Sequence, residues 1–150
     1  MPNDTTMAAT TLVLRHTFNA PIEHVYDAWL TPDVIKEFYA PGEAVCPSAE
    51  VDARVGGTYR IVMRHADGED FVSYGVYREL TRPTKIVCTQ QWEEDDKADE
   101  HETLMTLEFA AKGSQTELTL THQNFRDAAQ RDRHIKGWSG CLEKFERVVR

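Results

Sequence analysis

Histidine and cysteine are the residue types with the most chemical potential in this chain, and their spacing argues against a metal or redox site. The histidines are His16, His24, His65, His101, His122 and His134, and none forms an i, i+4 ligand pair on a predicted helix. Cys46, Cys88 and Cys141 are far apart and lack the Cys-x-x-Cys spacing of zinc and redox sites. We therefore predict no metal and no cofactor. Because each cysteine lies among apolar neighbours, we expect buried free thiols in a reducing, cytoplasmic compartment.

The same residues do not assemble a recognisable catalytic centre. His16 and His122 lie on predicted strands among apolar neighbours and would meet if those strands pair, but a hydrogen-bonded interior histidine is the preferred interpretation for each. Asp52 and Arg54 share one face of a strand, where an ion pair bracing the Gly56 and Gly57 turn is preferred over catalysis. The common nucleotide, zinc-protease and esterase motifs are absent from the sequence. We expect binding rather than catalysis.

Aromatic and sulfur-containing side chains suggest a different chemistry, the binding of an apolar or aromatic small molecule. Broad rings and adaptable methionines suit such a guest: as a set these residues favour a cavity, although for each residue alone ordinary core is the preferred interpretation. The candidate lining residues, with a lid at the first two, are Phe38, Tyr39, Tyr59, Met63, Phe71, Trp92, Met105, Trp138 and Cys141. Gly137 and Gly140 flank Trp138, which indicates either close packing or space left for a guest.

Helical and strand periodicities predict the elements that position these side chains. Residues 12–18 alternate as a half-buried strand, and Ile22, Val25, Tyr26 and Trp29 have the spacing of an amphipathic helix. A short second helix begins with Thr31 as N-cap and Pro32 at its first position, and ends near residues 38–39.

Further strands are predicted near residues 44–54, 58–65, 71–80, 85–92, 103–109 and 117–122, for about seven strands in all. Most connections are short, including a hairpin at Asp67 and Gly68, so the sheet is predicted to be antiparallel.

The C-terminal segment, residues 127–150, is predicted to be one long helix. Its apolar residues recur at spacings of three and four, from Ile135 through Trp138, Leu142 and Phe145 to Val149. Only a sheet offers enough apolar surface to cover such a stripe. The predicted fold is therefore α+β: a curved antiparallel sheet around a long C-terminal helix, in a single domain over residues 11–150 after a frayed segment, residues 1–10.

Composition excludes several classes of protein. The chain has 150 residues and a formal net charge of −8, which disfavours binding to nucleic acid. No apolar run is long enough to span a membrane. Residues 93–100, EEDDKADE, carry six acidic residues and one lysine, so this short segment holds −5 of that charge. Its preferred interpretation is a solvated hairpin tip.

Three stretches of the sequence resemble a known family. These are APIEHVYDAWLTPDVIKEFYAP at residues 20–41, the stretch at residues 51–92 with Asp52, Arg54, the Gly56 and Gly57 pair, Gly75 and Glu79, and the closing TELTLTHQNF and HIKGWSGCL. Together they resemble the heat-shock-protein-90 ATPase activator homologues of the START-like, polyketide-cyclase-like superfamily. The resemblance covers residues 11 to 149 or so. One departure is FYAP at residues 38–41, where the family usually has two tryptophans before Gly-Pro.

The resemblance implies a helix-grip fold with a cavity between the sheet and the long helix. Similar proteins bind lipids, plant hormones or polyketides, some cyclise polyketides, and eukaryotic members stimulate a chaperone ATPase. The leading hypothesis is thus a domain that binds a small hydrophobic molecule without turning it over, in a cavity of roughly 300–1,000 Å³. The alternatives are a co-chaperone-like module that binds a chaperone or other protein, and a cyclase- or hydrolase-type enzyme. A homodimer is common among similar proteins.

Overall fold

A curved antiparallel sheet forms the frame of the molecule. The computed structural model describes residues 9–150, so the predicted frayed segment falls almost wholly outside the described residues. Within that range the sheet has seven strands in the order β1-β7-β6-β5-β4-β3-β2. The strands are β1 (Thr11–Phe18), β2 (Val45–Val51), β3 (Thr58–Arg64), β4 (Asp70–Thr81), β5 (Lys85–Trp92), β6 (Thr103–Lys112) and β7 (Gln115–Gln123).

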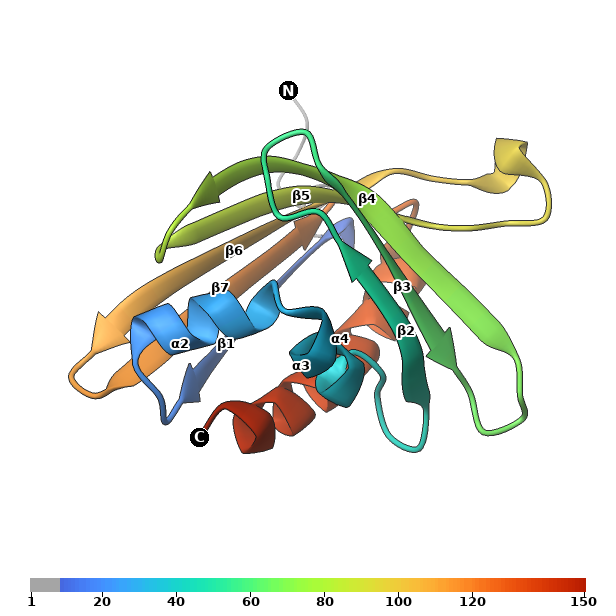
Figure 1. Ribbon diagram of the computed structural model, residues 1–150. Coiled ribbons are helices and arrows are strands. Elements are labelled where there is room, and N and C mark those ends of the chain that lie inside the picture. The colour runs from blue at the N-terminus through green and yellow to red at the C-terminus, as the bar shows by residue number, and fades with distance from the viewer. Residues whose placement is uncertain (1–8) are drawn as a thin grey trace, which may run out of the picture.

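The helices lie inside the curve of this sheet (Figure 1). They are α2 (Ile22–Trp29), α3 (Pro32–Phe38) and the long α4 (Ala128–Val149), with a short 3-10 helix, η1 (Lys97–Asp99), in the acidic segment. The predicted α+β helix-grip architecture is confirmed. Figure 1 shows β2 to β7 running as a meander, with β1 returning to pair with β7. No helix within residues 9–150 has both the length and the apolarity to cross a membrane.

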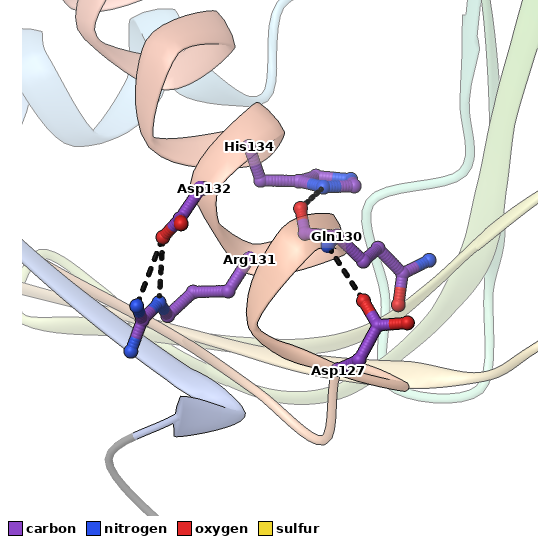
Figure 2. Close-up of polar contacts among 5 residues, drawn as sticks. All are labelled: Asp127, Gln130, Arg131, Asp132 and His134. Atoms are coloured by element: carbon purple, nitrogen blue, oxygen red, sulfur yellow. Dashed lines mark hydrogen bonds and ion pairs between the residues drawn. The ribbon is translucent and has the colours of Figure 1, made fainter.

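Alternation along the strands determines which side chains face the helices. On β3, Tyr59, Ile61 and Met63 are buried while their neighbours Thr58 and Arg60 are exposed. The buried apolar residues of α4 complete this core from the other side, as its predicted stripe requires: Trp138, Cys141, Leu142, Phe145 and Val149. At the start of α4, Asp127 accepts a 2.8 Å hydrogen bond from the Gln130 backbone N–H and so caps the helix (Figure 2).

The junction of α2 and α3 differs from its prediction in one detail. Thr31 occupies the N-cap position and Pro32 the first helical position, but the Thr31 hydroxyl makes no capping hydrogen bond. It donates instead to the Asp27 carbonyl, 2.7 Å away in the preceding helix. Because α2 and α3 are nearly continuous, this carbonyl in the last turn of α2 is within reach of the Thr31 hydroxyl, and it also accepts a 3.1 Å hydrogen bond from the Leu30 N–H.

The hydrogen bonding between β4 and β5 is locally rearranged beside Gly75, although the strand register there does not shift. Tyr59 lies opposite Gly75 on the neighbouring strand, and its hydroxyl donates a 2.6 Å hydrogen bond to the Thr89 carbonyl. The Val76 N–H donates to the Thr89 side-chain oxygen at 2.9 Å. A Cβ at Gly75 would lie 2.0 Å from the Thr89 carbonyl oxygen and 2.9 Å from the Tyr59 hydroxyl. The absence of a side chain at residue 75 thus allows the Tyr59 ring to cross to β5.

The two glycines of α4 have opposite surroundings. A Cβ at Gly140 would lie 2.8 Å from the Pro41 Cβ, so this glycine allows close packing of α4 against the segment after α3. A Cβ at Gly137 would meet nothing within 4 Å. Of these two glycines, Gly137 is therefore the one with space beside it.

We predict that Gly75→Ala lowers the free energy of unfolding by more than about 2 kcal/mol, because the new methyl group would overlap a main-chain oxygen. Gly137→Ala is the matched control. It adds the same methyl group to a helix in open space, and should raise the free energy of unfolding by about 0.5–1 kcal/mol. Urea unfolding of both variants measures this, and similar stabilities for the two would contradict the close approach at Gly75.

Candidate functional site

A small interior hollow lies between the sheet and the helices α2 and α3. The hollow there has a volume of about 20 Å³. Its lining residues are Trp29, Ile35, Tyr39, Tyr59, Ile61, Tyr77, Ile86, Cys88 and Met105. Such a volume suits about one water molecule, whereas ligand pockets occupy roughly 300–1,000 Å³. This hollow is therefore too small to hold a ring-containing guest.

The predicted lining residues separate into three groups. Tyr39, Tyr59 and Met105 line the small interior hollow. Phe38, Met63, Trp138 and Cys141 are buried elsewhere in the core, and Trp92 is half-buried against it. Sequence reasoning did not include Trp29, Ile35, Ile61, Tyr77, Ile86 and Cys88 among the lining residues. Ile61 and Tyr77 were within reach of the same alternation argument, because they share strand faces with residues that were included.

Phe71 lies at the exposed end of the predicted face of the sheet. Its side chain is 38% exposed, and its ring lies 4.6 Å from that of His65. Phe71 pairs with the buried Met63, so it does face the predicted side of the sheet. It lies close to the hairpin turn at Asp67 and Gly68, however, where the strands extend into solvent.

The expected lid at Phe38 and Tyr39 is part of the packed core. Phe38 is fully buried, with its ring 4.5 Å from Phe145 and 5.0 Å from Trp29. The Tyr39 ring packs edge-on against Trp138 at 5.3 Å. Burial raises the pKa of Tyr39 well above its ordinary value, so this phenol stays neutral.

A chain of buried polar groups crosses the sheet beneath α4. The Trp138 indole N–H donates to His122 Nδ1 at 3.1 Å, and His122 Nε2 lies 2.7 Å from the Thr103 hydroxyl. That hydroxyl contacts both the backbone and the side-chain oxygen of Gln90, at 2.8 and 3.0 Å. The Gln90 amide then donates to Ser73 at 3.1 Å. All five side chains are buried, and within the described residues no buried side-chain nitrogen or oxygen lacks a partner.

A second histidine, His134, accepts an indole hydrogen bond through its other ring nitrogen, Nε2. His134 Nδ1 lies 2.9 Å from the Gln130 carbonyl, which only accepts, so Nδ1 carries the proton (Figure 2). His134 Nε2 therefore accepts the 3.0 Å hydrogen bond from the Trp92 indole N–H. The rings of His122 and His134 lie 5.3 Å apart.

Both histidines are fixed in their neutral forms by an indole donor. An indole N–H only donates, so each imidazole must present a lone pair to it. Burial lowers the pKa of His122 well below its ordinary value, and neighbouring His134 lowers it further. Burial also lowers the pKa of His134. Because the lone pair of each ring is already used, this arrangement suits a structural role better than that of a general base.

The other candidate groups do not join this chain. His16 pairs with Leu118 in the sheet and does not meet His122, and its Nε2 lies 3.5 Å from Glu146. Arg54 and Asp52 form the predicted ion pair, at 2.8 Å and exposed.

The three cysteines are buried and free, as predicted. Burial raises the pKa of Cys88 and of Cys141 to about 12, so both remain protonated and unreactive near neutral pH. Residues 9–150 contain no group of three or more His, Cys, Asp or Glu side chains arranged to hold a metal ion.

A larger hollow lies on the opposite face of the sheet, over β3, β4 and β5. This outer groove has a volume of about 360 Å³. Its lining residues are Thr58, Tyr59, Arg60, Tyr74, Gly75, Val76, Thr89, Gln91, Glu93 and Glu102. Arg60 and Glu93 pair at 3.0 Å across it, and the Gln91 amide contacts Glu102 at 3.5 Å. Tyr59 lines both hollows, since its hydroxyl reaches the rearranged ladder at Thr89.

The acidic loop, residues 93–102, begins and ends at two lining residues of this groove, Glu93 and Glu102. It projects beyond the sheet (Figure 1). Residues 93–99 are exposed, which confirms the predicted solvated tip. The loop is nevertheless anchored at its base. The Tyr74 hydroxyl hydrogen-bonds Glu100, which raises the pKa of Tyr74 to about 12, and the Asn124 amide donates to the Glu102 carbonyl at 2.9 Å.

Comparison with known proteins gives consistent results for sequence and structure. The family model described as Activator of Hsp90 ATPase homolog 1-like protein matches residues 19–150. A solved structure of a Chromobacterium violaceum protein is similar with a TM-score of 0.85 and 28% identity, covering 93% of this chain and 96% of that one. No curated protein matches the chain significantly.

Two further solved structures share the fold at lower identity. The AHSA1 protein of Silicibacter pomeroyi has a TM-score of 0.81 and 23% identity, covering 91% of this chain and 95% of its own. A Nitrosomonas europaea protein has a TM-score of 0.78 and 19% identity, covering 93% of this chain and 94% of its own.

We predict that the protein loses stability as the pH falls from 7.5 to 5.5. In the unfolded chain, His122 and His134 take up protons near pH 6.5. In the folded chain, their lowered pKa values keep these two histidines unprotonated. The free energy of unfolding should then fall by up to about 1.4 kcal/mol per pH unit for each histidine.

Urea unfolding across this pH range measures the slope, and His122→Gln should reduce it by about half. His24→Gln, an exposed position on α2, is the control and should leave the slope unchanged. If His122→Gln does not fold, His134→Gln provides the same measurement. A slope that neither buried substitution alters would contradict the assignment.

We also predict that Trp138→Phe lowers the free energy of unfolding by about 1–3 kcal/mol, because the His122 lone pair loses its donor in a buried site. Trp138→Ala should cost about 3–5 kcal/mol, since the ring is lost as well. Trp92→Phe removes the equivalent donor from His134 at a half-buried site, and should cost less than Trp138→Phe. Equal losses at the two tryptophans, measured by urea unfolding, would count against the buried chain.

Proposed function

The chain belongs to the activator of Hsp90 ATPase homolog 1-like family, and from this membership we propose that it is a co-chaperone-like protein-interaction module. The observation that carries the proposal is the filled interior, whose hollow of about 20 Å³ leaves no room for a ring-containing guest.

Free-energy magnitudes favour this function over the binding of a small molecule inside the fold. Opening about 300 Å³ in a packed core costs about 7 kcal/mol at about 24 cal/mol per Å³. Burying about 300 Å² of an apolar ligand gains about 7 kcal/mol at about 25 cal/mol per Å². The two nearly cancel, so nothing remains to offset the loss of translational and rotational freedom on association.

The aromatic packing explains why the interior would resist opening. The Trp29 ring lies 5.1 Å from Phe145 and 5.9 Å from Trp138, so α2 and α4 are joined through their largest side chains. Phe38 adds a contact from α3 at 4.5 Å to Phe145. A guest would have to displace rings that three helices share.

The surface offers features suited to a protein partner. The acidic segment, residues 93–100, carries −5 of the chain's −8 charge, and it is anchored beside the outer groove. A fixed, charged loop next to a hollow favours recognition through complementary charge. Three buried free thiols support a reducing compartment, and we place this interaction in the cytoplasm.

We predict that the protein raises the ATPase rate of Hsp90 from the same cells and binds it in sedimentation experiments. Reversing the charge of the exposed loop tip with Glu94→Lys and Asp95→Lys should weaken binding at least several-fold, whereas Glu143→Lys, exposed on α4, should not.

Native mass spectrometry of the protein from its own cells completes the test. We expect a mass equal to the polypeptide alone. A stoichiometric small molecule retained in the complex, together with no effect on Hsp90, would overturn the proposal in favour of ligand binding.

A further inference from the structure

We propose that the outer groove binds an arginine side chain on an extended segment of the partner protein. This inference rests on the proposed interaction function and names the surface and the partner chemistry.

The shape of the groove is the first argument. Its volume of about 360 Å³ lies within the range of roughly 300–1,000 Å³ typical of ligand-binding pockets. Its floor is the rearranged part of the ladder, where Gly75 carries no side chain and the Thr89 carbonyl is hydrogen-bonded by Tyr59. The close contacts that forbid a Cβ at Gly75 join β3, β4 and β5, so the hollow is part of the folded sheet.

The charge of the groove is the second argument. Glu93 directly follows β5, Glu102 directly precedes β6, and both line the groove. Glu100 lies next to them, hydrogen-bonded to Tyr74. Arg60 on β3 is the cation among the lining residues, and it is paired with Glu93. With three carboxylates and one guanidinium, the site has a net negative charge. The remaining acidic residues of the loop increase this negative charge.

The arrangement of the carboxylates favours arginine over lysine. The groove already contains one example of the pairing: Arg60 Nε lies 3.0 Å and its Nη2 lies 3.5 Å from the two oxygens of Glu93. Glu102 is exposed, and within residues 9–150 its carboxylate accepts one long contact, 3.5 Å from the Gln91 amide. Its oxygens therefore keep acceptor capacity for the planar fork of a second guanidinium.

The apolar wall accommodates the rest of an arginine side chain. Tyr74 and Val76 are half-buried and line the groove on β4. An aromatic face beside a carboxylate suits a guanidinium, which stacks on rings, and Val76 suits the methylene stem. Lysine would present only a point charge to the same surface.

The test uses the peptide acetyl-Gly-Val-Arg-Val-Gly-amide as probe. We expect it to shift the backbone NMR resonances of Thr58, Val76 and Gln91, and to bind more weakly as salt is raised. The same peptide with citrulline, which keeps the shape and removes the charge, should bind at least 10-fold more weakly, by about 1.4 kcal/mol or more. The affinity of the same peptide with lysine should lie between those of the arginine and citrulline peptides.

Matched substitutions locate the site. Glu102→Gln should weaken binding of the arginine peptide at least five-fold, and Glu143→Gln on the exposed face of α4 should leave it unchanged. Equal affinity for the arginine and citrulline peptides, resonance shifts outside the groove, or full binding by Glu102→Gln would each overturn the proposal.

The Hsp90 assay distinguishes failure of this inference from failure of the proposed function. If wild-type protein stimulates Hsp90 and Glu102→Gln does so equally well, the groove is not the partner site, and the interaction function stands. If wild-type protein neither binds nor stimulates Hsp90, the interaction function is itself wrong. Parallel loss of Hsp90 stimulation and of peptide binding in Glu102→Gln is the outcome that we expect.

Discussion

The apolar stripe of α4 must be covered along its whole length, and the rest of the structure depends on that requirement. A helix of 22 residues presents Trp138, Leu142, Phe145 and Val149 along one face. A flat sheet would contact that face along only part of its length, so the sheet curves around it. The two short helices then close the remaining side, with α3 packing directly against α4.

Polar groups in this core are tolerated because each completes the hydrogen bonding of another. Trp138 and His122 illustrate the rule: the indole N–H needs an acceptor, and the lone pair on His122 Nδ1 needs a donor. Such pairs specify how α4 is rotated and placed along the sheet, which apolar contacts alone define less sharply. The interior therefore combines apolar packing with a directional constraint, and both oppose the rearrangement that a large guest would need.

Much of the fold could be predicted from the sequence because its signals are local. Alternation within residues 12–18 and the spacing of the α4 stripe depend on neighbours a few positions apart. The filled interior could not be predicted, since the volume left between layers depends on how side chains from six or more elements interdigitate. The Trp138 and His122 pair joins a helix to a strand, and the Tyr59 contact crosses Gly75 to reach Thr89. These long-range contacts have no periodic signature, and Tyr59, Gly75 and Thr89 all line the outer groove.

The pairing of β1 with β7 has a consequence for how the chain folds. Thr11 lies opposite Gln123 in the sheet, and Phe18 lies opposite Thr116, so this edge joins segments about a hundred residues apart. The hairpins from β2 to β7 can form from contacts close in sequence, but β1 must wait until β7 exists. Loop-closure entropy makes such distant pairing slow, and the topology has a high contact order. During synthesis, β1 emerges from the ribosome first and finds its partner among the last strands made.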